Sequence, residues 1–291
     1  MKIALTGAGG GLGRAFLETC PSHHDVAAFT HDELDIGDHQ AVLQTVVPLA
    51  PELIVNAAAF TKVDACETEP ERAYRDNTIG PHNLALAARA CGAMLLHVST
   101  DYVFDGEKGA PYDELDAPNP ISVYARSKLG GETAVRSALP ESFVVRTGYV
   151  FGGGTDYLTG ALRRLAAGEE AGGFVDRTGT PTYVRHLAER LLPLVLTHRF
   201  GLYHLGGPEP ATWFEVLTRA KAIGNLPGTV VEQKADELGL PAARPRESAL
   251  RSIFTAELGV SSMPPLDGAL RHLMSCLSDA RGTGSGVIGS S

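Results

Sequence analysis

The 291-residue sequence is poor in the residues that build disulfide scaffolds, metal clusters and membrane spans. Its four cysteines are scattered and form no CxxC pair, so we expect reduced thiols in a cytoplasmic protein. The ten histidines show no HExxH spacing, and no metal site is predicted from them. No apolar run approaches the roughly 18 residues of a spanning helix. The first residues enter a strand directly, so no signal peptide is expected.

Positive charge is also in short supply. The chain has 25 Lys and Arg against 34 Asp and Glu, a formal net charge of −9. This balance argues against nucleic acid or an anionic membrane as the main partner. A hydrophobic content of 44% and a charged content of 20% are ordinary for a globular protein. The length allows one large domain or two.

Glycine, in contrast, is abundant, and it is concentrated near the N-terminus in residues 7–13, Gly-Ala-Gly-Gly-Gly-Leu-Gly. A short apolar run, residues 2–6, precedes these glycines, and a helical pattern follows them. Glycines at such a turn let the backbone approach a pyrophosphate, which the helix N-terminus attracts. The pattern therefore predicts a dinucleotide site. Its predicted contacts are Gly7, Gly10, Gly11 and Leu12.

The end of the second predicted strand, residues 25–29, bears on the choice of cofactor. Folds that prefer NAD usually have an acid here, which holds the ribose 2′-hydroxyl. This chain has Thr30 and His31 instead, and Arg14 and His31 could face a 2′-phosphate. NADPH is therefore favoured, with NADH as the alternative. The residues predicted at the adenosine end are Thr30, Asp35 and Ile36.

Short apolar strands alternate with helices as far as residue 147. The clearest strands cover residues 53–56, 94–99 and 143–147. Unbroken apolar strands of this kind predict a parallel sheet covered on both faces, a Rossmann-type doubly wound α/β fold. Ligands of such sheets bind beyond the carboxyl ends of the strands. One crevice is therefore expected to collect the glycine loop, Ala57, Ala58, Ala59, Thr100 and Thr147.

The alternation loosens after residue 147, which suggests a second domain. We predict a dinucleotide-binding domain over residues 1–147, with a returning segment near 172–197. A smaller C-terminal substrate-binding domain is predicted over residues 148–171 and 198–281. Residues 282–291 are rich in glycine and serine, and we predict a disordered tail there.

Tyr124 and Lys128 are four residues apart on a predicted helix, so they share one helix face. A nearby ammonium favours the phenolate and should lower the tyrosine pKa from its usual value near 10. Such a tyrosine can give a proton to a carbonyl oxygen while a nicotinamide supplies hydride. Thr100, at the end of the preceding strand, can bond the same oxygen. Thr100, Tyr124 and Lys128 are the predicted catalytic residues, and Tyr124 and Lys128 are also expected to contact the cofactor.

Together these elements resemble the extended short-chain dehydrogenase/reductases, and longer stretches resemble the dTDP-4-dehydrorhamnose reductase family. The stretches are residues 55–64 (VNAAAFTKVD), 97–106 (HVSTDYVFDG) and 124–132 (YARSKLGGE). The resemblance implies NADPH-dependent reduction of the C4 ketone of a dTDP-4-keto-6-deoxy sugar. It assigns the same catalytic trio. It also places Asp101, Val103 and Tyr149 near the sugar and Arg244 near the nucleotide diphosphate.

The sequence departs from this family at several positions. Gly148 and Tyr149 stand where Ser and Trp are common, Arg177 where Gln is usual, and His186 where an acid is common. Some relatives dimerise around a divalent metal held by an acid just after the glycine loop. This chain has Arg14 and Ala15 there, so no metal is predicted and a homodimer stays open.

Two other functions stay open. One is a nucleotide-sugar epimerase or dehydratase of the same superfamily. A dehydratase normally has an acid pair beside the catalytic threonine, whereas this chain has Asp101 alone. The other is a non-catalytic, dinucleotide-binding regulatory subunit. Such subunits tend to lose the tyrosine or the lysine, and both are present here. The sequence does not specify which keto sugar is used or which stereoisomer forms.

Overall fold

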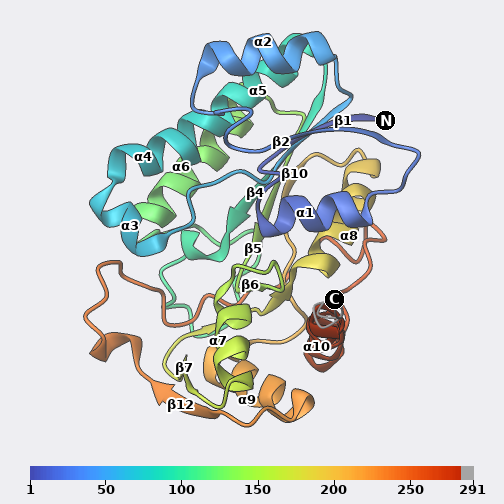
Figure 1. Ribbon diagram of the computed structural model, residues 1–291. Helices are drawn as coiled ribbons and strands as arrows, with labels where there is room; N and C mark the ends of the chain where they lie inside the picture. Colours follow the sequence, from blue (N-terminus) through green and yellow to red (C-terminus); the bar gives the residue numbers. More distant parts are fainter. Residues whose placement is uncertain (283–291) are drawn as a thin grey trace.

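The computed structural model describes residues 1–282, which are built around a six-stranded parallel sheet (Figure 1). The strand order is β10-β5-β4-β3-β1-β2, and each neighbouring pair is parallel. This confirms the predicted Rossmann-type fold. The strands are β1 (Lys2–Thr6), β2 (Asp25–Phe29), β3 (Leu53–Asn56), β4 (Met94–Thr100), β5 (Ser142–Thr147) and β10 (Gly201–His204).

Helices cover both faces of the sheet, and alternate strand residues pack against opposite layers. In β5, Val145 belongs to the apolar cluster of one face and Val144 to that of the other. Burial on both faces explains why the central strands are apolar throughout. The helices of one face are α1 (Gly11–Thr19) and α8 (Val184–Leu196), and those of the other are α2 (His39–Leu49), α5 (Gly80–Cys91) and α6 (Val123–Ala138) (Figure 1).

The helical stretch from Pro70 to Cys91 is divided into three parts. It consists of α4 (Pro70–Tyr74), the π-helical turn η1 (Arg75–Ile79) and α5, and the short helix α3 (Val63–Thr68) precedes it. The π turn carries the buried Asn77, whose amide bonds the backbone of Phe60 and the hydroxyl of Ser127. The wider turn thus connects the loop after β3 to helix α6.

The smaller part of the molecule has its own apolar cluster, which includes Leu162, Leu217 and Leu270. No helix within residues 1–282 combines the length and apolar character needed to cross a bilayer. The elements here and in the connecting loops are η2 (Asp101–Val103), β6 (Val150–Phe151), α7 (Tyr157–Ala166), β7 (Glu170–Phe174), β8 (Thr178–Gly179), β9 (Thr182–Tyr183), β11 (Ala211–Thr212), α9 (Trp213–Gly224), β12 (Thr229–Gln233), η3 (Ala235–Glu237) and α10 (Leu266–Gly282).

The division into two domains stays a prediction, but two of its details differ from the structure. Strand β10 was placed with residues 198–281 in the smaller domain, whereas it pairs with β5 and extends the large sheet. The sequence of a four-residue strand followed by irregular chain does not indicate which strand it pairs with. Gly282 was assigned to the tail, yet it ends α10. The rest of the predicted tail, residues 283–291, lies outside the described residues.

A buried ion pair joins strands β4 and β5 to helix α6 at the centre of the fold. Arg146 of β5 donates two hydrogen bonds to the Glu132 carboxylate of α6, at 2.9 and 2.7 Å. Ser99 of β4 donates to the same carboxylate at 2.6 Å. Both charged side chains are at most 5% exposed. The pair therefore fixes α6 against the ends of β4 and β5.

Glu132→Gln should lower the free energy of unfolding by about 3–5 kcal/mol, because it leaves Arg146 buried without a counter-charge. Urea denaturation followed by circular dichroism measures the change. Glu169→Gln is the matched control, since Glu169 pairs with Arg164 on the exposed surface and should change stability little. Similar losses in the two variants would show that the buried pair has no special part in stability.

Candidate active site

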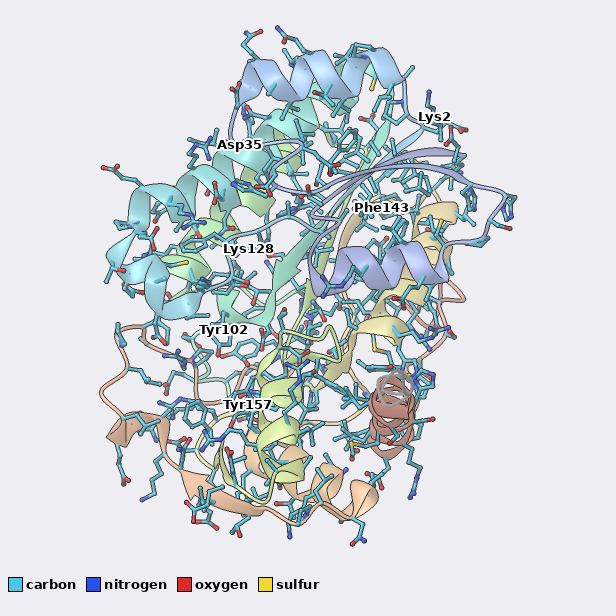
Figure 2. All side chains as sticks on the ribbon, viewed as in Figure 1. Lys2, Asp35, Tyr102, Lys128, Phe143 and Tyr157 are labelled. Carbon is cyan, nitrogen blue, oxygen red and sulfur yellow. The ribbon has the colours of Figure 1, made fainter. Side chains whose placement is uncertain are left out.

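A cavity of about 500 Å³ lies beyond the carboxyl ends of β1, β3, β4 and β5, where the sequence predicted a crevice. Thr100, Tyr124 and Lys128 all line it. In Figure 2, Lys128 and Tyr102 lie between the sheet and the part of the molecule that carries Tyr157. The other predicted residues in its wall are Gly10, Gly11, Leu12, Ala57, Ala59, Asp101, Thr147 and Tyr149.

The start of helix α6 places Tyr124 beside Thr100. Ser122 caps this helix by accepting a hydrogen bond from the Ala125 amide at 3.2 Å. The Tyr124 phenol lies beside the Thr100 side chain, which favours ionisation of the phenol. The Thr100 hydroxyl in turn accepts from the Tyr102 amide at 3.2 Å. The backbone therefore fixes the position of the threonine beside the phenol.

Burial shifts the titration of both helix residues toward their neutral forms. Burial raises the pKa of Tyr124, and this outweighs the opposite effect of the Thr100 side chain. The expected net lowering of that pKa is therefore wrong, because burial is the largest effect on it. Burial likewise lowers the pKa of Lys128 to about 8, although the Glu132 charge opposes it. Its Nζ donates to the Val98 carbonyl at 2.7 Å. Tyr124 thus holds its proton at neutral pH, as a proton donor must.

Asp101 lies next to the two hydroxyls with its carboxyl buried. Thr100 Oγ1 donates to one carboxylate oxygen at 3.1 Å, and Ser248 Oγ donates to the other at 2.5 Å. Burial raises the pKa of Asp101 to about 7 against these hydrogen bonds. A Cβ built at Gly148 would come within 2.5 Å of the carboxyl. Glycine at position 148 therefore leaves the space that this carboxyl occupies.

A second cavity, of about 340 Å³, shares Gly10, Ala57 and Ala59 with the first. Gly7 has a φ of 77° and packs so tightly that a Cβ would lie 2.5 Å from the Ala58 nitrogen. Among the described residues, no side chain caps the start of α1 at Gly10. Its free amide groups suit a pyrophosphate. The remaining predicted residues in this cavity are Gly7, Asp35, Ile36 and Ala58, and His31 also lines it.

Two residues predicted at the cofactor lie differently. Thr30 is next to this cavity, but it is not among the lining residues, and its hydroxyl donates to Glu33 at 2.8 Å. Arg14 does not join His31. Its guanidinium donates to the carbonyls of Gly9 and Gly153, and the residue lines another cavity, which α1, α8 and α10 enclose. The backbone carbonyls of two glycine loops thus hold Arg14.

Of the predicted sugar contacts, the cavity contains Asp101 and Tyr149, but neither Val103 nor Arg244. The Val103 side chain is fully buried with Phe104, Tyr112 and Leu250. Its predicted contact is therefore wrong for the side chain, because that side chain packs in the core.

Arg244 lines a separate cavity of about 210 Å³, together with Arg177. It donates to both carboxylate oxygens of Asp64, at 3.0 and 2.7 Å. The charges of Arg244 and Arg177 both act on the Tyr102 phenol, which lines the larger cavity. The arginine cavity therefore lies close to the larger one.

Two residues of the site, Trp213 and Ser248, have no role predicted from the sequence. Trp213 lines the large cavity and stacks on Tyr149, with ring centroids 4.9 Å apart and parallel planes. Trp213 is the only tryptophan in the sequence, and it follows Thr212, which forms a capping box with Glu215. A single tryptophan at a helix start could have marked this position. Nothing in the sequence pairs Ser248 with Asp101, which is 147 residues away.

Comparison with known proteins identifies relatives along nearly the whole chain. Residues 1–278 match the family model described as RmlD substrate binding domain. The dTDP-4-dehydrorhamnose reductase of Mycobacterium tuberculosis strain H37Rv is 39% identical over 292 residues, which cover 96% of this chain and 92% of that protein. The reductase of Mycolicibacterium smegmatis is 37% identical, with 95% and 86% covered.

Solved structures give the same result. The dTDP-4-dehydrorhamnose reductase of Clostridium acetobutylicum superposes with a TM-score of 0.92 at 32% identity, covering 96% of this chain and all of that one. The Bacillus anthracis reductase, solved in complex with NADP, has a TM-score of 0.91 at 33% identity, with 94% and 98% covered. A UDP-glucose 4-epimerase of Thermotoga maritima, 20% identical with a TM-score of 0.84, shares the fold alone. The chain therefore belongs to the dTDP-4-dehydrorhamnose reductase family.

Proposed function

We propose that this protein reduces the C4 ketone of a dTDP-4-keto-6-deoxy sugar with NADPH, as in the synthesis of dTDP-L-rhamnose or a related deoxysugar. Family membership and the NADP complex of the Bacillus anthracis relative support the reaction and the cofactor. The observation that carries the proposal is the convergence of Thr100, Tyr124 and Lys128 in one cavity beside the glycine loop. The cytoplasmic location and a homodimer stay predictions.

The glycine loop and the ends of β2 and β3 provide the place for the cofactor. The amide groups at the start of α1 are proposed to bind its pyrophosphate. Asp35 and Ile36 are proposed to bound the adenosine, with Thr30 beside them, and residues 57–59 to line the path between the two cavities. When bound, NADPH supplies the hydride. Lys128 is proposed to hold the nicotinamide ribose.

Tyr124 is the proposed proton donor to the ketone oxygen. Burial keeps its phenol protonated, and the residue lines the cavity together with Thr100. Thr100 is proposed to bond the same oxygen and so to fix the carbonyl. In its charged form, Lys128 would favour the phenolate that remains after the proton has left.

The opposite wall of the cavity is the proposed sugar site. Tyr149 and Trp213 present stacked aromatic rings there. Arg244 is proposed to bind the diphosphate, since an arginine fork matches phosphate oxygens. For this to happen, Asp64 has to release Arg244 or share it with the substrate.

Incubation with dTDP-4-keto-6-deoxy-L-mannose and either NADPH or NADH, followed by identification of the sugar product, tests the function. Formation of the 4-hydroxy sugar with oxidation of NADPH is expected. An epimerised or dehydrated product with no net consumption of NADPH would instead support the epimerase or dehydratase alternative. Lack of any reaction would favour a regulatory subunit, although both Tyr124 and Lys128 are present.

Tyr124→Phe should lower kcat by two or more orders of magnitude, because it removes the general acid. Binding of NADPH, measured by fluorescence titration, should change little. Tyr74→Phe is the matched control, since Tyr74 is exposed on α4, and its kcat should stay near that of the unchanged protein. A Tyr124→Phe variant with near-normal kcat would remove Tyr124 from the mechanism.

Arg244→Ala should raise KM for the dTDP-sugar by about tenfold or more, the value of a charged hydrogen bond, with a smaller effect on kcat. Steady-state kinetics with varied sugar concentration measure both constants. The control is Arg246→Ala, an exposed neighbour that pairs with Asp236. If Arg244→Ala leaves KM unchanged, the diphosphate binds elsewhere.

A further inference from the structure

A line of buried polar side chains runs from the proposed proton donor to a carboxyl group. The Tyr124 phenol lies beside the Thr100 side chain, which acts on its pKa, and Thr100 Oγ1 donates to Asp101 Oδ1 at 3.1 Å. The far oxygen of Asp101 accepts from Ser248 Oγ at 2.5 Å. All four residues are at most 8% exposed. The line therefore connects the reacting phenol to a buried acid with a single hydroxyl between them.

The surroundings of Asp101 favour its protonated form. No Lys, Arg or His within residues 1–282 forms an ion pair with it, and its hydrogen bonds come from hydroxyl and backbone groups. Three phenols lie close enough to Asp101 for its charge to raise their pKa values. They are those of Tyr102 on the same turn, Tyr124 of α6 and Tyr149 after β5. Lys128 of α6 lines the same cavity. A buried carboxyl without a counter-charge ionises at a cost, which favours retention of its proton.

We infer that Asp101 stores the proton that restores Tyr124 after each reduction, that Thr100 relays this proton, and that Ser248 positions the store. This inference rests on the proposed reductase function. In the first step, the Tyr124 O–H bond breaks and the ketone oxygen gains the proton. The phenolate then takes the Thr100 hydroxyl proton while Thr100 Oγ takes the proton of Asp101. Asp101 remains as a carboxylate and regains a proton from water once the product has left.

The pKa of Asp101 suits the function of a proton store. Burial raises the pKa of Asp101 to about 7, so the store is partly filled at neutral pH. Ionised Asp101 also raises the pKa of Tyr124, which makes the phenol a weaker acid. Both effects lower the rate as the pH rises through 7.

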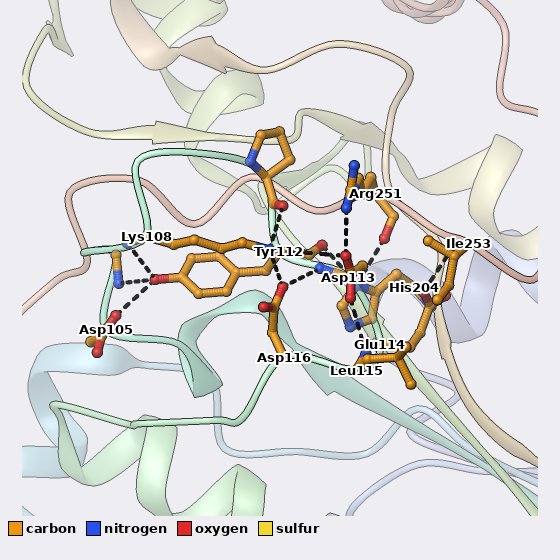
Figure 3. A network of polar contacts seen from close by, with 12 residues as sticks. Asp105, Lys108, Tyr112, Asp113, Glu114, Leu115, Asp116, His204, Arg251 and Ile253 are labelled. Atoms are coloured by element: carbon orange, nitrogen blue, oxygen red, sulfur yellow. Dashed lines mark hydrogen bonds and ion pairs between the residues drawn. The ribbon is translucent and has the colours of Figure 1, made fainter.

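Ser248 reaches Asp101 from the C-terminal segment, which two sets of contacts fix in place. Beside Ser248, its own amide donates to the Thr178 carbonyl at 2.8 Å, and the Leu250 amide donates to Thr180 Oγ1 at 2.7 Å. Further along, the Glu114 carboxylate accepts from the Ser252 hydroxyl. It also accepts from the Ile253 amide (Figure 3). The serine hydroxyl is therefore held at the carboxyl by the fold around it.

The pH dependence of kcat/KM tests the store, because this ratio reports groups of the free enzyme. In the unchanged protein the alkaline limb should have its midpoint near the pKa of Asp101, about 7. Asp101→Asn should move this midpoint up toward the pKa of Lys128, about 8. The same variant should lower kcat by about tenfold, less than removal of the acid itself. An unchanged midpoint in Asp101→Asn overturns the inference.

Ser248→Ala separates positioning from storage. The serine hydrogen bond lowers the pKa of Asp101, so its loss should move the alkaline limb to higher pH while kcat at acidic pH stays nearly normal. Ser248→Thr should restore the original limb. Ser252→Ala is the matched control. Ser252 lies on the same segment as Ser248 but donates to a different buried carboxylate, that of Glu114. A limb that moves in Ser252→Ala but not in Ser248→Ala contradicts the positioning role.

A measurement without substrate distinguishes failure of the inference from failure of the proposed function. The pKa of Asp101 is raised from 3.8 to about 7 on folding, so its contribution to stability is lost as the pH rises through this interval. Asp101→Asn should therefore gain stability relative to the unchanged protein between these pH values in urea denaturation. Absence of turnover together with this gain rejects the reductase function alone. Normal turnover without this gain rejects the proton store alone.

Discussion

The structure depends on one buried ion pair, between Arg146 and Glu132, with the Ser99 hydroxyl bound to the same carboxylate. Each of the three residues adjoins a wall of the large cavity. Thr100 follows Ser99, Thr147 follows Arg146, and Lys128 lies one helical turn before Glu132. Replacement of both residues of such a buried pair by apolar ones often costs little stability, whereas removal of only one partner is costly. Its effect here is geometric, since it fixes the register of α6 against β4 and β5.

The same packing determines how the site titrates. Close burial raises the pKa of Tyr124 and of Asp101 and lowers that of Lys128, so desolvation moves acids and base alike toward their neutral forms. The sequence suggested that the phenol would be tuned by its neighbouring ammonium. In the structure, burial has the largest effect on the pKa values of both Tyr124 and Lys128. The charge of Glu132 raises the pKa of Lys128 and so offsets part of the lowering by burial. A site arranged in this way retains protons until a reaction removes them.

The fold and the catalytic trio could be predicted because their signals are local. Apolar runs specify the central strands, glycines mark the turn after β1, and a spacing of four places Tyr124 and Lys128 on one helix face. The residues that sequence analysis missed or misplaced depend on contacts between distant segments. Strand β10 joins the sheet through pairing with β5, and Ser248 reaches Asp101 across 147 residues. Val103 follows the motif residue Asp101, but the turn after β4 directs its side chain into the core. No periodicity in the sequence encodes these outcomes.

Two polar contacts link residues 244–248 to the sheet half of the molecule, Ser248 with Asp101 and Arg244 with Asp64. They differ in their exposure to water, and this difference suits them to different functions. The bond from Ser248 to Asp101 is buried away from water, so its loss leaves a buried polar group unpaired. The pair of Arg244 and Asp64 is more open, with the aspartate side chain 39% exposed. Water can solvate the partly exposed Asp64 carboxylate when Arg244 turns to a diphosphate, which lowers the cost of the exchange. The buried bond can therefore keep the proton machinery assembled while the open pair changes partners for the substrate.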